Sequence, residues 1–293
     1  MHPQVPETLD GFCVLHQMFR VRWAALRALP DEARVALAAE ATAALTALEG
    51  RPAEEGASAA FSMVGHKGDL LLLHFRKSFD AINEAELGLS RLRLWEFLEP
   101  TTSYVSVVEL GLYDATVRTH AELREQGIAE GGEEWLAAIE AMKAETRQVM
   151  KKRLWPAIPP RRYLCFYPMD KKRGETKNWY SEDIKRRAEM MLEHGKIGRG
   201  YAGSVTQMIS GSIGFDDFEW GVDLFADDPV VFKKLVYEMR FDAASADYGV
   251  FGAFYLSLRV PAADFGTWLD GTLPAYLPPA APAGGPPHGR PAR

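Results

Sequence analysis

Apolar residues alternate or recur at helical spacing along most of the chain, and these patterns predict its elements. In the first half they predict a strand at residues 12–23, a helix at 31–48, a hairpin of 59–65 with 69–76, a helix at 79–98 and a strand at 103–110. The second half repeats this order, with a strand at 163–167, a helix at 181–194, strands at 202–209 and 218–225, a helix opened by Asp228 and Pro229, and a strand at 251–260.

The repeated order is βαββαβ, which is the order of a ferredoxin-like unit. Two such halves can pair their sheets into one barrel with helices outside, and a flat ligand then fits between sheet and helix. We therefore expect an α+β fold in which two ferredoxin-like halves form a dimeric α/β barrel with outer helices.

Domain boundaries follow from the same pattern. We assign residues 1–120 to an N-terminal half, 121–160 to a helical connector, 161–262 to a C-terminal half and 263–293 to a disordered tail. Within the connector, a hinge at 126–132 precedes helical periodicity at 133–154, whose outer face also fits a charged, exposed spacer. Proline, alanine and glycine dominate from Leu273 onward, which is typical of disorder.

Composition narrows the functional classes. The net charge is -6, which argues against general nucleic-acid binding because phosphate contacts need an excess of clustered cations. Cys13 and Cys165 are the only cysteines and lie on separate predicted strands, so we expect no disulfide framework and a reducing, cytoplasmic location. The pattern shows neither a signal peptide nor a membrane span.

His194 closes the helix predicted at 181–194. Ser181 is a suitable N-cap, and Gly195 is expected as the left-handed residue that ends the helix. His194 continues an apolar stripe that includes Met191, so we expect the imidazole to face the core. A lone histidine on an apolar stripe is more often a packed or hydrogen-bonded core residue than a metal ligand, and one at a helix C-terminus also gains from the helix dipole.

Several segments together resemble the coproheme decarboxylase branch of the chlorite dismutase family. They are YPMDKKR at 167–173, NWY at 178–180, HGKIGR at 194–199, GFDDFEWG at 214–221, LVYEMRFD at 235–242 and, more weakly, YVSVVEL at 104–110. The resemblance implies that His194 is the axial iron ligand, that Tyr167 is oxidised to a radical, and that Lys171 handles a propionate or its proton.

The same resemblance places a distal residue thirteen positions after the axial histidine, at Gln207. The chlorite dismutases have an arginine there, and a neutral glutamine disfavours chlorite chemistry. For the four propionates of the substrate, the resemblance nominates Arg153, Arg240, Ser245, Tyr113 and Trp179. Three of these have ordinary alternatives: an ion pair with Glu238 or Asp242 for Arg240, a helix cap for Ser245 and simple packing for Trp179. The alternative for Tyr167 is a buried, hydrogen-bonded phenol.

The reaction implied by the resemblance is oxidative. Hydrogen peroxide oxidises the iron of bound Fe-coproporphyrin III (coproheme), which is both substrate and redox cofactor, and the Tyr167 radical attacks two propionates in turn, giving vinyl groups, carbon dioxide and haem b. Relatives form homopentamers, so we expect a homo-oligomer. A haem peroxidase or chlorite-degrading enzyme on the same fold, and a haem-binding or chaperone-like module without turnover, remain alternatives.

Overall fold

The computed structural model of the chain describes residues 5–276. Its strands are β1 (Thr8–Val21), β2 (Gly56–Met63), β3 (Leu70–Arg76), β4 (Leu98–Gly111), β5 (Tyr163–Lys171), β6 (Thr206–Gly211), β7 (Trp220–Ala226), β8 (Gly249–Phe251) and β9 (Tyr255–Val260). Its helices are α1 (Trp23–Arg27), α2 (Asp31–Glu49), α3 (Phe79–Ser90), α4 (Tyr113–Glu125), α5 (Glu133–Val149), α6 (Lys151–Leu154), α7 (Ile184–Gly200), α8 (Val230–Met239), α9 (Ala243–Tyr248) and α10 (Phe265–Leu269). Short 3₁₀ helices are η1 (Ala53–Glu55), η2 (Arg93–Phe97), η3 (Trp179–Ser181) and η4 (Ala262–Asp264).

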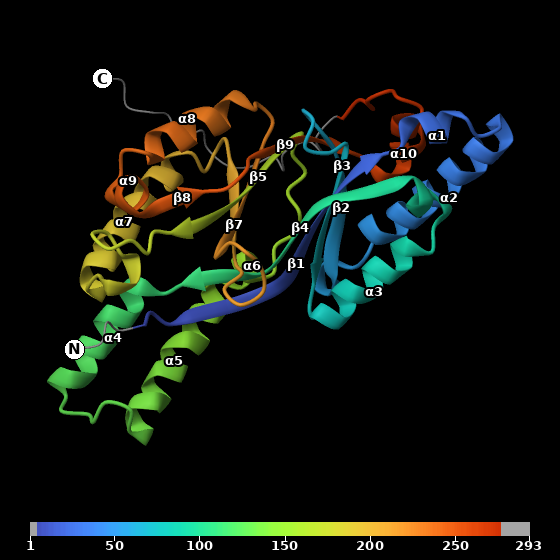
Figure 1. Cartoon of the computed structure of the whole chain (residues 1–293). Helices are drawn as coiled ribbons and strands as arrows, with labels where there is room; N and C mark the ends of the chain where they lie inside the picture. The colour runs from blue at the N-terminus through green and yellow to red at the C-terminus, as the bar shows by residue number, and fades with distance from the viewer. Residues whose placement is uncertain (1–4, 277–293) are drawn as a thin grey trace.

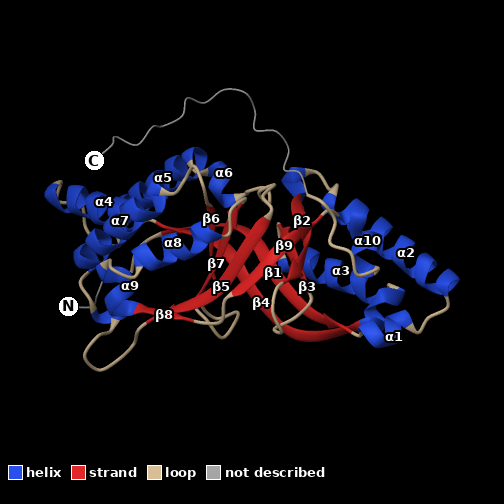
Figure 2. Ribbon diagram, turned by 90° about the horizontal axis from the view of Figure 1, so that it is seen from above, coloured by secondary structure: helices blue, strands red, loops and turns tan. Residues whose placement is uncertain are grey.

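All the strands belong to one sheet, in the order β7-β6-β4-β1-β3-β2-β9-β5-β8. Because β5 also pairs with β7, the hydrogen-bonded order returns to its first strand and closes a ring. Helices α2, α3 and α10 lie on one side of the strands and α7, α8 and α9 on the other (Figures 1 and 2). The predicted α+β class is confirmed.

The element order βαββαβ occurs twice, as β1-α2-β2-β3-α3-β4 and as β5-α7-β6-β7-α8-β9. Antiparallel pairing of β2 with β9 and of β4 with β6 joins the two runs. Between them, α5 and α6 form where helical periodicity is predicted at 133–154. Helix α4 was not predicted, because it is mostly polar and only Thr116 and Leu123 of it are buried.

Alternation along β5 sorts its side chains between two hydrophobic clusters. Leu164 and Phe166 join the cluster that includes Val14 on β1, whereas Cys165 and Tyr167 join the cluster beneath α8. Strand alternation in the sequence predicts that residues 163, 165 and 167 share one face, and all three indeed lie in this second cluster. This alternation is what turns Tyr167 toward the α7–α9 layer.

Two predicted elements break where the sequence pattern is continuous. The helix expected at 79–98 ends at Ser90, and residues 93–97 form η2. Leu89 and Leu94 both enter the α2-side core, which a single helix could not arrange because residues five apart lie on different faces. The strand expected at 251–260 is likewise divided into β8 and β9, and the strand expected at 202–209 begins only at Thr206 after a turn.

The prediction that residues 263–293 are disordered is wrong for the first part of this range. Helix α10 lies within residues 263–293, and its Phe265, Trp268 and Leu269 are buried against α2. These three apolar side chains account for its order. Residues 277–293, on which the rest of that prediction falls, lie outside the described part of the chain.

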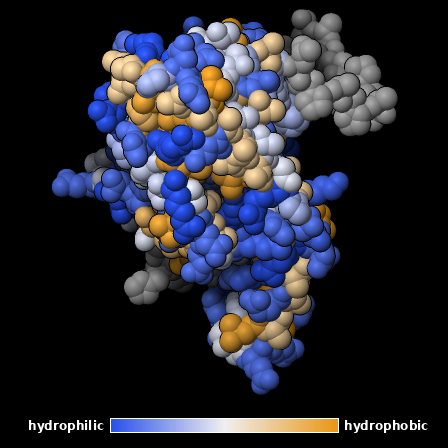
Figure 3. Space-filling model, turned by 90° about the vertical axis from the view of Figure 1, so that its right-hand side faces the viewer, coloured by the Kyte–Doolittle hydropathy of each residue, from blue (hydrophilic) through white to orange (hydrophobic). Residues whose placement is uncertain are grey.

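Within residues 5–276, no helix is long and apolar enough to cross a membrane. The face that carries α1, α2 and α3 is mostly hydrophilic, with hydrophobic residues interspersed (Figure 3).

Candidate functional site

Helix α7 carries His194 but has different ends from those expected. Asp183 caps its N-terminus by accepting a hydrogen bond from the Lys185 amide at 2.8 Å, whereas Ser181 ends η3. The helix continues through Gly195, which does not adopt the left-handed conformation, to Gly200. Ile197 packs against the cluster around Tyr167, so tertiary contacts hold the last turn in place.

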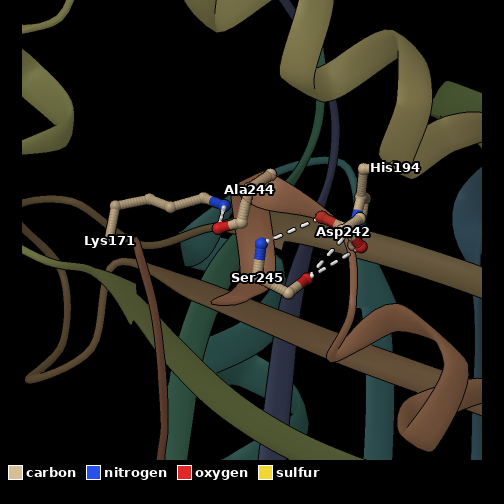
Figure 4. Close-up of polar contacts among 5 residues, drawn as sticks. All are labelled: Lys171, His194, Asp242, Ala244 and Ser245. Carbon is tan, nitrogen blue, oxygen red and sulfur yellow. Dashed lines mark hydrogen bonds and ion pairs between the residues drawn. The ribbon is translucent and has the colours of Figure 1, made fainter. Parts of the chain in front are cut away.

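The imidazole of His194 does not enter the core, and that expectation is wrong. Its side chain is 29% exposed, and its Nδ1 lies 2.9 Å from Oδ2 of Asp242, whose side chain is fully buried. Asp242 is also the N-cap of α9: its Oδ1 accepts the Ser245 amide at 2.9 Å and its Oδ2 accepts the Ser245 hydroxyl at 3.1 Å. Figure 4 shows these contacts. Asp242, and not Ser245, is therefore the capping residue.

The position of the proton between His194 and Asp242 follows from the state of the carboxylate. Burial by itself would raise the pKa of Asp242, but hydrogen bonds and charge from His194, with hydrogen bonds from Ser245, outweigh burial and lower it. The ionised carboxylate can only accept, so His194 Nδ1 carries the proton and donates it. Nε2 is then the ring nitrogen left to bind iron, which it does when the imidazole is neutral. Sequence reasoning missed Asp242, although an Asp three residues before Ser245 is a helix-cap signal.

Lys171 lies beside this cluster at the end of β5. Its ammonium donates to the Ala244 carbonyl at 3.3 Å (Figure 4) and lies 4.6 Å from the centre of the Trp179 ring. Burial lowers the pKa of Lys171 to about 8, although the charges of Asp242 and Glu219 act in the opposite direction. A buried lysine with this pKa can change protonation near neutral pH, as a proton-transfer group must.

Tyr167 is buried four residues earlier on the same strand. Its ring stacks on Phe254 with centroids 4.5 Å apart, and burial raises its pKa, with Cys165 adding to the effect and Arg240 opposing it. Because proline lacks an N–H, the sequence predicts that strand pairing ends at Pro168; this prediction is wrong, since β5 stays paired as far as Lys171. The Pro168 carbonyl accepts a hydrogen bond from the Gly252 amide, in the break between β8 and β9. The ring nitrogen of Pro168, which has no N–H to donate, is on that same side of β5, so no hydrogen bond to β7 is lost.

Trp179 and Tyr113 extend the site toward α4. Trp179 is buried and contacts Tyr248 edge-on at 5.3 Å and Tyr113 at 6.3 Å. Burial raises the pKa of Tyr113, against the lowering effects of a hydrogen bond with Trp179 and the charge of Arg187. The packing role considered for Trp179 is thus present, and it coexists with the contact to Lys171.

The remaining candidates are dispersed. Arg240 is exposed, its guanidinium lies 4.2 Å from the centre of the Phe251 ring, and among the described residues no carboxylate pairs with it. The expected alternative pairs with Glu238 or Asp242 are therefore absent in this part of the chain. Gln207 on β6 donates to the Gly198 carbonyl of α7 at 3.3 Å. Arg153 is exposed on α6, which packs on β1 and β4.

The structure thus brings His194, Ser245, Lys171, Trp179 and Tyr113 into one polar and aromatic cluster around α9. Tyr167 and Arg240 both contact Phe251, beside this cluster. Gln207 contacts Gly198, one turn after His194 on α7. Of these candidates, Arg153 alone has no hydrogen bond, ion pair or ring contact, within residues 5–276, that links it to this cluster.

The donor set fits an iron porphyrin better than a free metal ion. Among the described residues, no group of three or more His, Cys, Asp or Glu side chains gathers to hold a metal. A single imidazole with its second nitrogen fixed by a carboxylate suits a metal whose other positions are already filled by a macrocycle.

Comparison with known proteins gives a consistent picture. The chlorite dismutase family model matches residues 34–260. The coproheme decarboxylase of Staphylococcus saprophyticus is 44% identical over 255 residues, covering 87% of this chain and 94% of that protein. The enzyme of the same name from Staphylococcus carnosus is 42% identical over 259 residues, covering 88% and 95%. A protein of Haloquadratum walsbyi named as heme-binding is 45% identical over 269 residues, and this chain spans 48% of its length.

Solved structures agree at the level of the fold. A heme-binding protein from Thermus thermophilus superposes with a TM-score of 0.78 at 38% identity, covering 92% of this chain and 100% of that one. A chlorite dismutase from Candidatus Nitrospira defluvii superposes with a TM-score of 0.65 at 18% identity, covering 89% and 95%, which shows a shared fold alone.

Proposed function

Because the chain belongs to the chlorite dismutase family, we propose that it is a coproheme decarboxylase of haem biosynthesis, which converts two propionates of Fe-coproporphyrin III to vinyl groups and so forms haem b. The single observation that carries this proposal is the half-buried His194, whose Nδ1 is held by the buried Asp242. That hydrogen bond leaves Nε2 to bind the iron of coproheme, while Tyr167 and Lys171 occupy the facing strand.

Several cations and donors are suited to the propionates. Arg240 is exposed without a carboxylate partner in the described chain, so it can pair with a substrate carboxylate at little cost. We assign Ser245, Tyr113, Trp179 and, from α6, Arg153 to the same task. We also assign Gln207 to the opposite face of the porphyrin, which its amide can serve only after it releases the Gly198 carbonyl of α7. Its lack of charge argues against chlorite chemistry.

Each round of the proposed reaction consumes one hydrogen peroxide and one proton, and it yields a vinyl group, one carbon dioxide and two waters. Bound coproheme supplies the iron at which peroxide is reduced. Tyr167 gives up an electron and its phenolic proton, and the resulting tyrosyl radical removes a hydrogen atom from the β-carbon of a propionate. Loss of a second electron with carbon dioxide completes the vinyl group.

Lys171 and the surroundings of Tyr167 suit these steps. Burial holds Tyr167 protonated, so its oxidation must release a proton. The Lys171 ammonium, with its pKa of about 8, can pair with the propionate and return a proton after decarboxylation.

We also propose the finer architecture. The two βαββαβ runs are ferredoxin-like halves, residues 1–120 and 161–262, that close as a dimeric α/β barrel; the closed ring of strand pairing supports this. The protein assembles as a homo-oligomer, a pentamer as its resemblance to the family implies.

The test is peroxide titration of the coproheme complex, with the porphyrin followed by mass spectrometry. Wild-type protein should release two carbon dioxide equivalents and give haem b. Tyr167→Phe should bind coproheme normally and lose this conversion by more than about a hundredfold, because phenylalanine cannot donate the electron and proton.

Other outcomes identify other functions. Oxygen release from chlorite would indicate a chlorite-degrading enzyme, and oxidation of added donors without carbon dioxide a haem peroxidase. Tight binding with no product would indicate a haem-binding module. Any of these results would contradict the decarboxylase proposal.

A further inference from the structure

Two phenylalanine rings pack against the ring of Tyr167. Phe254 stacks on it with centroids 4.5 Å apart and an interplanar angle of 27°, and Phe251 lies 5.8 Å away. Phe251 is the last residue of β8, and Phe254 is the last residue of the break at 252–254 between β8 and β9. The position of Phe254 on Tyr167 therefore depends on how this short segment is held.

The hairpin between β2 and β3, which belongs to the other half of the molecule, contacts this segment from outside. The Val64 amide donates to the Leu256 carbonyl at 2.9 Å. The Lys67 ammonium donates to the Phe254 carbonyl at 2.6 Å and lies 5.3 Å from the centre of the Tyr255 ring. On its other side, the segment is attached to β5 by the bond from the Gly252 amide to the Pro168 carbonyl at 2.9 Å.

These contacts divide the two neighbouring aromatic rings between two faces. Tyr255 stacks on Phe166 at 6.0 Å, on the face of β5 opposite to Tyr167, while Phe254 stacks on Tyr167. A rotation of the backbone at 254 would move both rings. The charge-assisted hydrogen bond from Lys67 to the carbonyl at that position opposes such a rotation.

We propose that Lys67 is a positioning residue for Tyr167: its ammonium holds the Phe254 carbonyl, so that the Phe254 ring stays stacked on the phenol and excludes water from it. This inference rests on the proposed function, in which Tyr167 is the residue oxidised. Within the described chain, Lys67 contacts neither Tyr167 nor His194 directly, so it acts through the segment that carries Phe254.

The experiment compares Lys67→Met and Lys67→Arg with wild type. Lys77→Met is the matched control, because Lys77 is also an exposed lysine at the end of the same strand pair and has no ion pair among the described residues. In ligand-free protein, Lys67→Met should speed amide hydrogen exchange in peptide 251–256 by about three- to tenfold, the effect of losing one hydrogen bond. With coproheme and peroxide, it should slow decarboxylation about three- to tenfold at unchanged coproheme affinity.

Lys67→Arg should restore both measurements because it keeps the cation, and Lys77→Met should match wild type. Unchanged exchange in Lys67→Met, an equal effect in Lys77→Met, or a loss confined to coproheme affinity would overturn the proposal. If wild-type protein binds coproheme but releases no carbon dioxide, the proposed function fails; the exchange measurement still decides whether Lys67 holds the segment.

Discussion

At the scale of single residues, the site depends on one carboxylate that serves two elements. Asp242 caps α9 and orients the His194 ring, so the axial ligand and the helix that carries Ser245 are fixed together. A hydrogen-bonded carboxylate of this kind also makes the imidazole a stronger ligand.

Asp242→Asn separates these two roles, because asparagine is as good a helix cap as aspartate but carries no charge. We expect coproheme affinity to fall by about ten- to a hundredfold while stability changes little. Titration of the ligand-free protein, followed by absorbance, measures the affinity. Asp247→Asn, which removes only the surface partner of Lys177, is the control and should leave affinity unchanged. Equal affinities for the two variants would disprove the role of the charge.

Lys171 makes stability depend on pH. Its pKa is about 8 in the folded protein and 10.5 as the reference for the unfolded chain. Between these two pH values Lys171 is protonated in the unfolded state and deprotonated in the folded state. The free energy of unfolding should therefore rise with pH from about 8 upward, relative to Lys171→Met. Urea unfolding of both proteins across this range measures the difference. A difference that stayed flat, or fell with pH, would show that Lys171 is not desolvated as described.

At the scale of elements, tertiary contacts determined where α7 ends. Its sequence contains Gly195, Gly198 and Gly200, which weaken a helix, yet the helix continues because Ile197 contacts the cluster around Tyr167. The extension also brings the Gly198 carbonyl to Gln207.

Gly195→Ala distinguishes a continuing helix from a terminated one. A Cβ there would meet only the flexible end of Arg199, at 3.1 Å, so alanine should stabilise the ligand-free protein by about 0.5–1 kcal/mol. Thermal unfolding tests this. Destabilisation would mean that Gly195 adopts the left-handed conformation expected from sequence.

At the scale of the whole molecule, a buried pair links the two halves. His16 on β1 and Asp223 on β7 lie 2.8 Å apart with side chains 0% and 3% exposed, and the His16 ring stacks on Phe166. Because the strands close a ring, we expect the halves to unfold together.

Asp223→Ala should lower the free energy of unfolding by about 1–3 kcal/mol, because it leaves the buried His16 ring nitrogen without its hydrogen-bond partner. The double variant H16L/D223L should cost less, since it removes both polar groups. Glu99→Ala, which breaks the exposed pair with Arg22, should cost less than about 1 kcal/mol. Urea unfolding followed by fluorescence measures all three, and additive effects of the H16L and D223L single variants would rule out a coupled pair.

Local periodicity was enough to predict the α+β class, the repeated element order and the face of β5 that carries Tyr167, because strand alternation and helical stripes are properties of neighbouring residues. The resemblance of the sequence motifs to the family also indicated His194, Lys171 and Gln207 as candidates. Only the tertiary structure decided that His194 is partly exposed, that Asp242 lies against it, and that Lys67 reaches Phe254. The partners in those contacts are 48 and 187 residues apart. Such pairs meet only through packing of the whole chain, which no local pattern records.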